Sequence, residues 1–451
     1  MKTVEKKLSI SDYITIGSML FGLFFGAGNL IFPVHLGQEA GAQVFWANSG
    51  FLITAIGLPF LGVMAIGLTQ SEGVFQLASH VNRPYAYVFT ILLYLVIGPL
   101  YAVPRLATTS FEIGLAPFVP QKYTFFTLIC FNIVFFIVAF LLARKPAKLF
   151  DYIGRILNPL FLILLSILLI RTFMHPMGHV SDATVQASYQ ENAFFKGFVE
   201  GYNTLDALAS LAFGIIIVTT IRNRGVKNPN TIAKDTIKSG TISILAMGLI
   251  YSLLAYMGTK SLGVFSLSDN GGIALAEIAA HYFGGFGSVI LALIVILACL
   301  KTAIGLISAF SETFEEMFPS QKYLTYAILV SILACLVASV GLTKIIQFSI
   351  PILMFIYPLA MTLILLSLVG NFFKQDPRVY QTVTYFTLIA SIIDAVNASP
   401  AFIKESALGQ LLISFGEKWL PLFSIGMGWI LPATLGLVIG LIWHSLSKNK
   451  R

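Results

Sequence analysis

Apolar stretches about as long as a membrane is thick recur along the whole chain, and they constrain its fold more than any other feature. A bilayer core of about 30 Å needs roughly 20 apolar residues per helix. Twelve windows meet this length: 12–36, 43–68, 85–115, 123–142, 150–171, 194–221, 238–259, 284–310, 323–341, 345–369, 382–398 and 420–444. The sequence therefore predicts an all-α polytopic membrane protein with twelve transmembrane helices.

The composition agrees and excludes several classes of protein. Of the 451 residues, 57% are hydrophobic and 11% are charged, against about 45–50% and about 25% in a soluble domain. Soluble enzymes, disordered regulators and nucleic-acid-binding proteins are excluded. Cys130, Cys299 and Cys335 lie inside apolar runs, and the six histidines are scattered. This spacing predicts no firm metal site and no cofactor, and without a cluster of His, Asp or Glu a membrane enzyme is disfavoured.

Lysine and arginine are distributed unevenly over the two faces that these windows define. With the N-terminus in the cytoplasm, 19 of the 28 fall on inner flanks and seven on outer flanks. The outer seven are Lys122, Arg171, Lys196, Lys260, Lys344, Lys404 and Lys418. The positive-inside rule then predicts cytoplasmic termini, and it explains most of the net charge of +8. We interpret the long apolar stretch after Met1–Lys7 as an uncleaved first span rather than a signal peptide.

Backbone-breaking residues cluster in the first and sixth windows. Three glycines, an asparagine and a proline fall between Gly22 and Pro33, more than helix packing alone requires. The sixth window holds the small-residue segment 205–214, for which close helix packing is the alternative explanation. Since five windows separate the two, the sixth begins on the opposite face. This predicts inverted repeats over 12–171 and 194–369, two additional helices over 382–444, and a transporter site where helices 1 and 6 are broken.

Two motifs carry a resemblance to a known family. Gly26-Ala-Gly-Asn-Leu-Ile-Phe-Pro33 and Gly98-Pro-Leu-Tyr-Ala-Val-Pro-Arg105, with the twelve-span layout, resemble the bacterial branched-chain amino acid:cation symporters. The first motif also resembles the broken first helix of the sodium:neurotransmitter symporters, which implies the LeuT fold of five-plus-five inverted repeats. The resemblance implies import of leucine, isoleucine and valine across a bacterial cell membrane, coupled to sodium or protons. Membrane lipid is the expected surrounding, and no obligate protein partner is inferred.

A free amino acid is a zwitterion with an apolar tail, so its three parts need different partners. Backbone amides at the N-terminus of an unwound half-helix, and its dipole, suit the carboxylate, while carbonyls freed at the sixth-helix break, around Ala207 to Ser210, suit the ammonium. By the resemblance, an aromatic packs against the branched tail. The candidate substrate-binding residues are Ala27, Gly28, Asn29, Ala207, Ser210, Phe213 and Gly214.

The resemblance also implies a place for the coupling ion. One sodium would lie between first-helix carbonyls of Gly22 and Phe25 and residues Ala298, Lys301 and Thr302 of the eighth span. Family members commonly have two threonines there, and an ammonium cannot ligate a cation because it has no acceptor. We therefore favour a proton-coupled or cation-independent mechanism in which Lys301 replaces sodium, with sodium coupling as the alternative. In a second alternative, Lys301 snorkels toward the cytoplasm. Leu208, where related symporters have threonine, indicates that a second sodium site is absent.

Three further charged residues lie near the predicted site. Arg105 and Glu112 are seven residues apart and so share a helix face; they form either an outer gate or an anchoring ion pair. Asp206 belongs either to the sixth-span site or to a solvated vestibule. A channel is disfavoured by the two unlike halves, and a transporter of the same fold for another small neutral solute is the closest alternative function.

Overall fold

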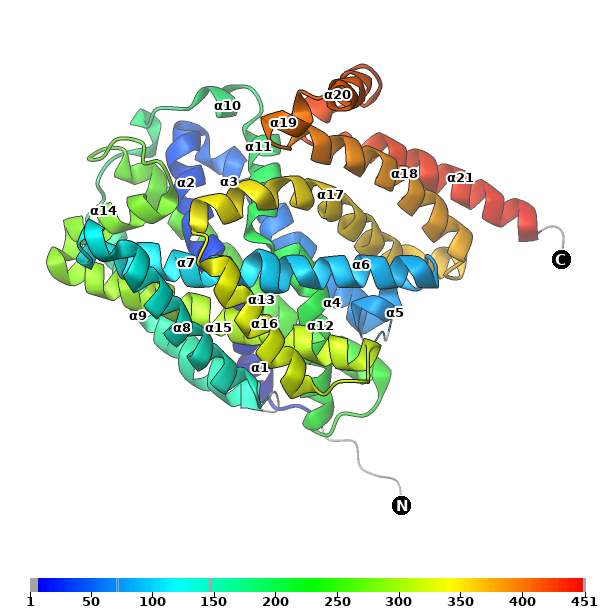
Figure 1. The fold of residues 1–451 in the computed structure, drawn as a ribbon, viewed down its shortest axis with the longest axis horizontal. Coiled ribbons are helices and arrows are strands. Elements are labelled where there is room, and N and C mark those ends of the chain that lie inside the picture. The colour runs from blue at the N-terminus through cyan, green and yellow to red at the C-terminus, as the bar shows by residue number, and fades with distance from the viewer. Residues whose placement is uncertain (1–6, 70, 72, 146–147, 449–451) are drawn as a thin grey trace.

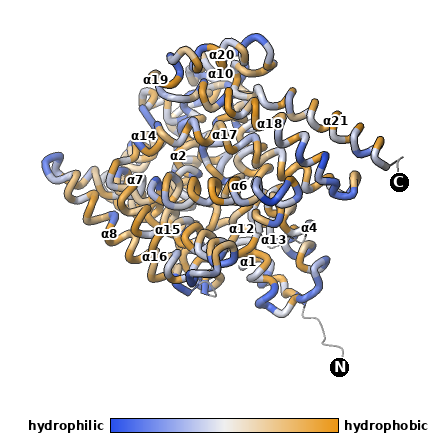
Figure 2. Tube along the Cα trace, turned by 45° about the vertical axis from the view of Figure 1, so that its right-hand side comes forward, coloured by the Kyte–Doolittle hydropathy of each residue, from blue (hydrophilic) through white to orange (hydrophobic). Residues whose placement is uncertain are grey.

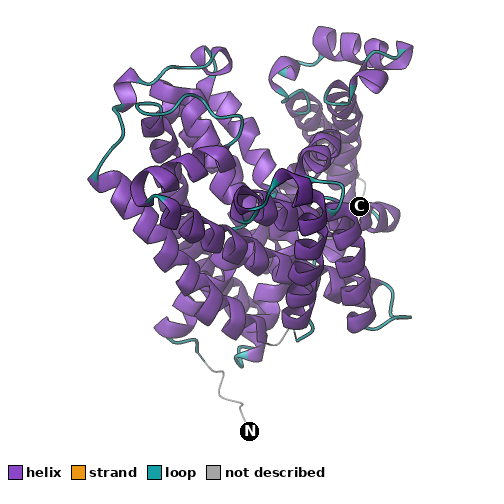
Figure 3. Cartoon of the chain, turned by 60° about the vertical axis from the view of Figure 1, so that its left-hand side comes forward, coloured by secondary structure: helices purple, strands orange, loops and turns teal. Residues whose placement is uncertain are grey.

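The computed structural model describes residues 7–69, 71, 73–145 and 148–448, and within them every regular element is helical (Figure 3). The α-helices are α1 (Ile10–Phe24), α2 (Ala27–Ala40), α3 (Val44–Leu52), α4 (Leu58–Leu68), α5 (Val74–Ala78), α6 (Arg83–Leu95), α7 (Ala102–Gly114), α8 (Thr124–Ala143), α9 (Asn158–Met174), α10 (Ala187–Gln190), α11 (Ala193–Glu200), α12 (Asp206–Asn223), α13 (Pro229–Ser261), α14 (Gly271–Phe283), α15 (Gly285–Met317), α16 (Tyr323–Ala338), α17 (Leu342–Val369), α18 (Pro377–Asn397), α19 (Ala401–Lys404), α20 (Ala407–Trp419) and α21 (Ile430–Lys448) (Figure 1). Of the residues counted for orientation, Lys2, Lys6, Lys450 and Arg451 lie outside the described part.

Ten helical stretches in the described residues are long and apolar enough to cross a membrane, and α1 and α16 are shorter apolar helices. Each of the twelve predicted windows overlaps at least one helix, although the count of twelve crossings stays a prediction. Hydrophobic residues run along most helices, and hydrophilic residues gather at helix ends and in loops (Figure 2). Large apolar side chains such as Phe126 and Leu245 are 69% exposed, as lipid contact requires. The chain is an integral membrane protein.

The first and sixth predicted spans are interrupted, and so is the third. Between α1 and α2 the backbone leaves the helix at Phe25 and Gly26. Ahead of α12, the short helix η9 (Gly201–Thr204) ends at Leu205, which has φ +67°. The segment η3 (Val96–Leu100) joins α6 to α7 and contains Gly98 with non-helical angles. The third break lies in the Gly98-Pro99 motif, whose helix-breaking effect the sequence analysis did not anticipate.

Glycines bring α2 and α13 into direct backbone contact. A side-chain carbon on Gly37 would collide with the Ala255 carbonyl, and one on Gly258 would collide with the Val34 carbonyl. The Thr259 hydroxyl also donates to the Gly37 carbonyl oxygen across the same contact, at 2.7 Å. Because close-packed interiors are not continuously deformable, α2, which follows the break, is held as one piece with α13.

The two additional helices, α18 and α21, run side by side at one edge of the molecule (Figure 1). A Cβ on Gly436 would stand 2.8 Å from the Thr382 carbonyl oxygen, so the two backbones nearly touch. At the end of the pair, Nδ1 of His444 lies 2.6 Å from Oδ2 of Asp376. The ion pair therefore joins the start of one additional helix to the end of the other.

This ion pair predicts a small, pH-dependent contribution to stability. Burial alone raises the pKa of Asp376, but hydrogen bonds from His444 and the Arg378 amide outweigh it, so this pKa lies below its ordinary 3.8. A carboxyl with a depressed folded-state pKa contributes stability above pH 3.8 and loses it as the pH falls through the folded-state pKa. In detergent, Asp376→Asn should lower the free energy of unfolding by less than about 1 kcal/mol at neutral pH. The difference in the free energy of unfolding between variant and wild type should vanish in strong acid. An equal difference at neutral pH and in strong acid would contradict this prediction. Asp182→Asn, at an exposed aspartate, is the control.

Candidate functional site

A small cavity lies between the breaks of the first and sixth helices. Its volume is about 20 Å³, room for about one water molecule. It is lined by Phe24, Gly26, Ala27, Gly28, Asn29, Ile97, Ala102, Arg105, Leu106, Thr204, Leu205, Asp206, Ala209, Thr302 and Leu306. These residues come from the breaks of the first and sixth spans and the helix ends beside them, from η3 and α7 of the third span, and from α15. The structure thus brings the three predicted residues of the first half-helix, 27–29, to the same cavity as the start of α12.

The Asn29 side chain links the two broken helices. Its Oδ1 accepts a hydrogen bond from the Gly26 amide, 2.8 Å away, and so caps α2. Its Nδ2 donates to Oδ2 of Asp206 at 2.5 Å and also bonds the Tyr251 hydroxyl. Tyr251 in turn donates to the same Asp206 oxygen at 2.9 Å. Asp206 is only 2% exposed, so it belongs to the site and is not a solvated residue of the vestibule.

Arg105 stands where this cavity meets a larger one. A vestibule of about 630 Å³ opens toward the predicted outer side and shares Gly28 and Arg105 with the small cavity. The guanidinium donates through Nη1 to the Asn203 carbonyl at 3.1 Å and packs on the Phe32 ring, with Cζ 5.6 Å from the ring centroid. The described lining of the vestibule holds three carboxylates, Glu112, Asp269 and Glu277. Arg105 therefore forms part of the boundary between vestibule and cavity.

The predicted pairing of Arg105 with Glu112 is not present as an ion pair among the described residues. Glu112 is exposed to the vestibule, whereas Arg105 is buried at its floor. Seven residues along a helix place two side chains on one face but two turns, about 10 Å, apart. The anchoring-pair alternative therefore does not describe this structure, and the gate stays a prediction.

The Lys301 ammonium is completely buried below the cavity. It donates to Oδ1 of Asn158 at 2.9 Å and lies 3.7 Å from the centroid of the Phe161 ring. Asn158 donates onward to the Ser18 carbonyl and hydroxyl oxygens of α1, at 3.0 and 2.9 Å, and it packs against Gly22. Because its ammonium is buried, Lys301 does not snorkel toward the cytoplasm in this structure. Within the described chain, no bond from Lys301 to the carbonyls of Gly22 or Phe25 is present, and its hydrogen bond goes to Asn158 instead.

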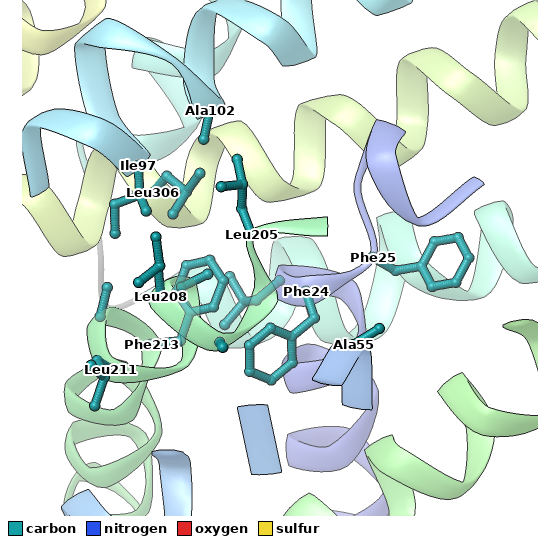
Figure 4. Packing of buried hydrophobic residues seen from close by; sticks show 14 of the residues in the cluster. Phe24, Phe25, Ala55, Ile97, Ala102, Leu205, Leu208, Leu211, Phe213 and Leu306 are labelled. Carbon is teal, nitrogen blue, oxygen red and sulfur yellow. The ribbon is translucent and has the colours of Figure 1, made fainter. Parts of the chain in front are cut away.

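The other predicted members of the ion set lie around Lys301. Ala298 is buried one turn earlier on α15. The Phe25 ring points away from Phe24 and Phe213 (Figure 4) and stacks on Phe21 with centroids 5.0 Å apart. The Thr302 hydroxyl lines the cavity, buried and without a hydrogen-bond partner in the described residues.

Four predicted substrate residues lie beside the cavity or beneath it rather than in its lining. The sixth-helix break falls at 201–205, so α12 already begins at Asp206. The Ala207 carbonyl is therefore inside the helix, where it accepts a hydrogen bond from the Ser210 hydroxyl at 2.7 Å. Ser210 and Gly214, one turn apart, pack against α4, at Gly62 and Ile66. The predicted free carbonyls at 207–210 are therefore wrong: the break lies earlier.

Phe213 is buried beside the cavity, on the part of α12 that runs from it toward the predicted cytoplasmic side. Its ring meets that of Phe24 edge to face, with centroids 5.5 Å apart (Figure 4), and it also contacts Gly305 of α15. A separate pocket of about 360 Å³ lies at the predicted cytoplasmic end, where Thr220 and Glu312 are among its lining residues. Phe213 thus lies on α12 between residues that line the cavity and residues that line this pocket, and a contact with the substrate tail requires the cavity to widen.

Several residues of the site were not singled out from the sequence. Tyr251 and Asn158 provide the partners of Asn29 and Lys301, and Thr204 and Ala209 line the cavity. A polar residue inside an apolar window is the signal that marks Asn158, because such residues usually face the interior of a helix bundle. Tyr251 carries no comparable signal, since tyrosine is common in such windows.

The comparisons with known proteins agree with this architecture. A family model described as "Branched-chain amino acid transport protein" matches residues 9–447. The chain is 43% identical over 449 residues to the branched-chain amino acid permease BrnQ of Lactobacillus delbrueckii subsp. lactis, with 99% of this chain and 100% of that one covered. It is 41% identical over 442 residues to BrnQ of Bacillus subtilis, with 97% and 98% covered.

Two solved structures have the same fold at low sequence identity. Mhp1, described as a nucleobase-cation-symport-1 family transporter, gives a TM-score of 0.59 at 13% identity, covering 96% of this chain and 93% of its own. MhsT in complex with L-phenylalanine gives 0.59 at 15% identity, covering 97% and 99%. The fold predicted from the broken helices, that of the LeuT-like transporters, is confirmed. With the full-length match to its family, the chain belongs to the branched-chain amino acid transport proteins, a family of permeases and not of enzymes.

Proposed function

We propose that the protein carries leucine, isoleucine and valine across a bacterial cell membrane by alternating access, with both termini in the cytoplasm. The full-length identity to relatives named branched-chain amino acid permeases supports this substrate class. The two helix breaks that meet at one cavity support the mechanism, because such breaks expose backbone groups to a substrate. An apolar pocket separates these three side chains only weakly, since one methylene is worth about 1–3 kcal/mol.

We further propose that the Lys301 ammonium takes the place of a coupling sodium ion. The observation that carries this proposal is the bond from its Nζ to Asn158, which ties α15 to α1 through Ser18. An ammonium at this position makes a second cation there unfavourable, because like charges repel in a low-dielectric interior. Transport is then driven by protons or independent of cations.

Leucine uptake into proteoliposomes, with sodium and proton gradients imposed separately, tests both statements. We expect saturable uptake that an inward proton gradient drives and that sodium does not change. Exchange of internal for external leucine without any gradient would mark the cation-independent form of the same mechanism. Uptake that requires sodium would contradict the proposed role of Lys301, but it would not contradict the proposed substrate class. No uptake and no exchange by verified proteoliposomes would contradict the substrate class.

A further inference from the structure

Two buried side chains of opposite charge line the small cavity without pairing with each other. Arg105 is 8% exposed and Asp206 is 2% exposed, and both belong to the lining. No direct ion pair joins them in the part of the chain that the structure describes. Buried charges are costly unless each is paired and hydrogen-bonded. A cavity that presents one of each sign is therefore suited to a ligand that carries both.

The guanidinium of Arg105 lies at the N-terminus of α2, the half-helix that follows the break in the first span. Its Nη2 is 3.2 Å from where a Cβ on Gly28 would stand, and Gly28 is the second residue of α2. Nη1 bonds the Asn203 carbonyl, while Nε is buried without a partner among the described residues. A guanidinium has five donors in a planar fork that matches a carboxylate. The Arg105 guanidinium and the N-terminus of α2 thus both favour an anion at the same position.

Two of the hydrogen bonds to the Asp206 carboxylate fall on the same oxygen. Asn29 and Tyr251 both donate to Oδ2, and the Thr204 side chain is a further polar neighbour of the carboxylate. These donors hold the carboxylate in place, because the Tyr251 ring is itself packed against Phe25 and Phe51 with centroids 5.6 Å away. A primary ammonium has three donors and no acceptor, so it complements the other oxygen, Oδ1.

We propose that Arg105 and Asp206 are the charged anchors of a zwitterionic α-amino acid, Arg105 for its carboxylate and Asp206 for its ammonium. This assignment rests on the function proposed above and deepens it. The present cavity holds about one water molecule, so the substrate widens it on arriving from the vestibule, which Arg105 also lines.

Three ligands, which differ in their charged groups, distinguish the role of Arg105 from that of Asp206. Leucine carries both charges, leucinamide keeps the ammonium and lacks the carboxylate, and 4-methylpentanoate keeps the carboxylate and lacks the ammonium. Binding of each to the purified full-length chain is measured by calorimetry or by thermal shift. Wild type should bind leucine about 100-fold more tightly than either analogue, since an unpaired buried charge costs on the order of a hundredfold in affinity.

Substitutions assign each charge to its side chain. Arg105→Gln should lower the affinity for leucine about 100-fold. It should change the affinity for leucinamide less than about 3-fold, because leucinamide has no carboxylate to bind Arg105. Asp206→Asn should lower the affinity for leucine by a similar factor and leave the affinity for 4-methylpentanoate unchanged. Arg171→Gln and Asp182→Asn, which change exposed residues, are matched controls that should bind leucine like wild type.

The outcomes that overturn the assignment are distinct from failure of the proposed function. If both variants bind leucine within about 3-fold of wild type, or if wild type binds the analogues as tightly as leucine, the anchors are wrong. The second result needs no variant, so it decides the matter even if Arg105→Gln or Asp206→Asn does not fold. If verified, folded wild type binds none of the three ligands, the proposed substrate class is wrong and the assignment falls with it.

Discussion

Leucine uptake by Lys301→Thr is expected to depend on sodium, whereas that of wild type is not. The substitution removes the ammonium that occupies the space between α15 and α1 and adds a hydroxyl, an oxygen ligand of the kind that sodium takes. Without sodium, Asn158 Oδ1 loses its donor and stays buried, at a cost of about 1–3 kcal/mol. Uptake should therefore fall by roughly tenfold or more without sodium and recover when sodium is added.

Two further variants make this result specific. Lys301→Met removes the charge without adding an oxygen, so its uptake should be low both with and without sodium. Lys122→Thr changes an exposed lysine and should leave uptake and its sodium response at the wild-type level. An unchanged sodium response in Lys301→Thr would exclude the sodium-replacement hypothesis.

The second large effect is expected from Asn29→Asp. Aspartate keeps an oxygen that can accept from the Gly26 amide, so the cap of α2 survives. The bond to Asp206, at 2.5 Å, becomes a contact between two carboxylates in a buried place, and like charges that close cannot both ionise. Breaking such a buried arrangement costs about 3 kcal/mol, so leucine affinity should fall on the order of 100-fold.

Comparison with Asn29→Ala separates the two roles of this side chain. Alanine loses the cap and the bridge but introduces no charge, so its affinity loss should be smaller and its melting temperature lower than that of wild type. Asn371→Asp, at an exposed asparagine, controls for the added charge. Leucine binding by Asn29→Asp equal to that of wild type would show that the two broken helices are not linked through this residue.

Local sequence predicted the first helix break well and the sixth less well. Gly26 and Asn29 are recognisable because a glycine and a capping side chain together mark a helix start, and α2 begins at Ala27 as expected. The sixth break depends on Leu205, a non-glycine residue with positive φ. Such a residue gives no sign in the sequence, since tertiary packing imposes that conformation. The predicted carbonyl acceptors at 207–210 are misplaced for this reason.

The connections between helices were not readable from the sequence. Asn158 and Lys301 are 143 residues apart, and Asn29 and Tyr251 are 222 apart. Periodicity within a helix shows which residues share a face, but not which face of another helix they meet. The sequence therefore identified Lys301 as unusual in an apolar window and left burial and snorkelling both open, while its partner required the packing of α9 against α15.

The charges of the vestibule have a consequence for how a substrate enters. Its described lining holds the carboxylates of Glu112, Asp269 and Glu277 and one guanidinium, that of Arg105, which also lines the inner cavity. Carboxylates that outnumber cations in a concave surface make its electric potential negative. We therefore expect an anionic amino acid to meet net repulsion there, and a zwitterion to gain by turning its carboxylate toward Arg105. On this expectation the vestibule selects molecules by charge before the cavity selects them by shape.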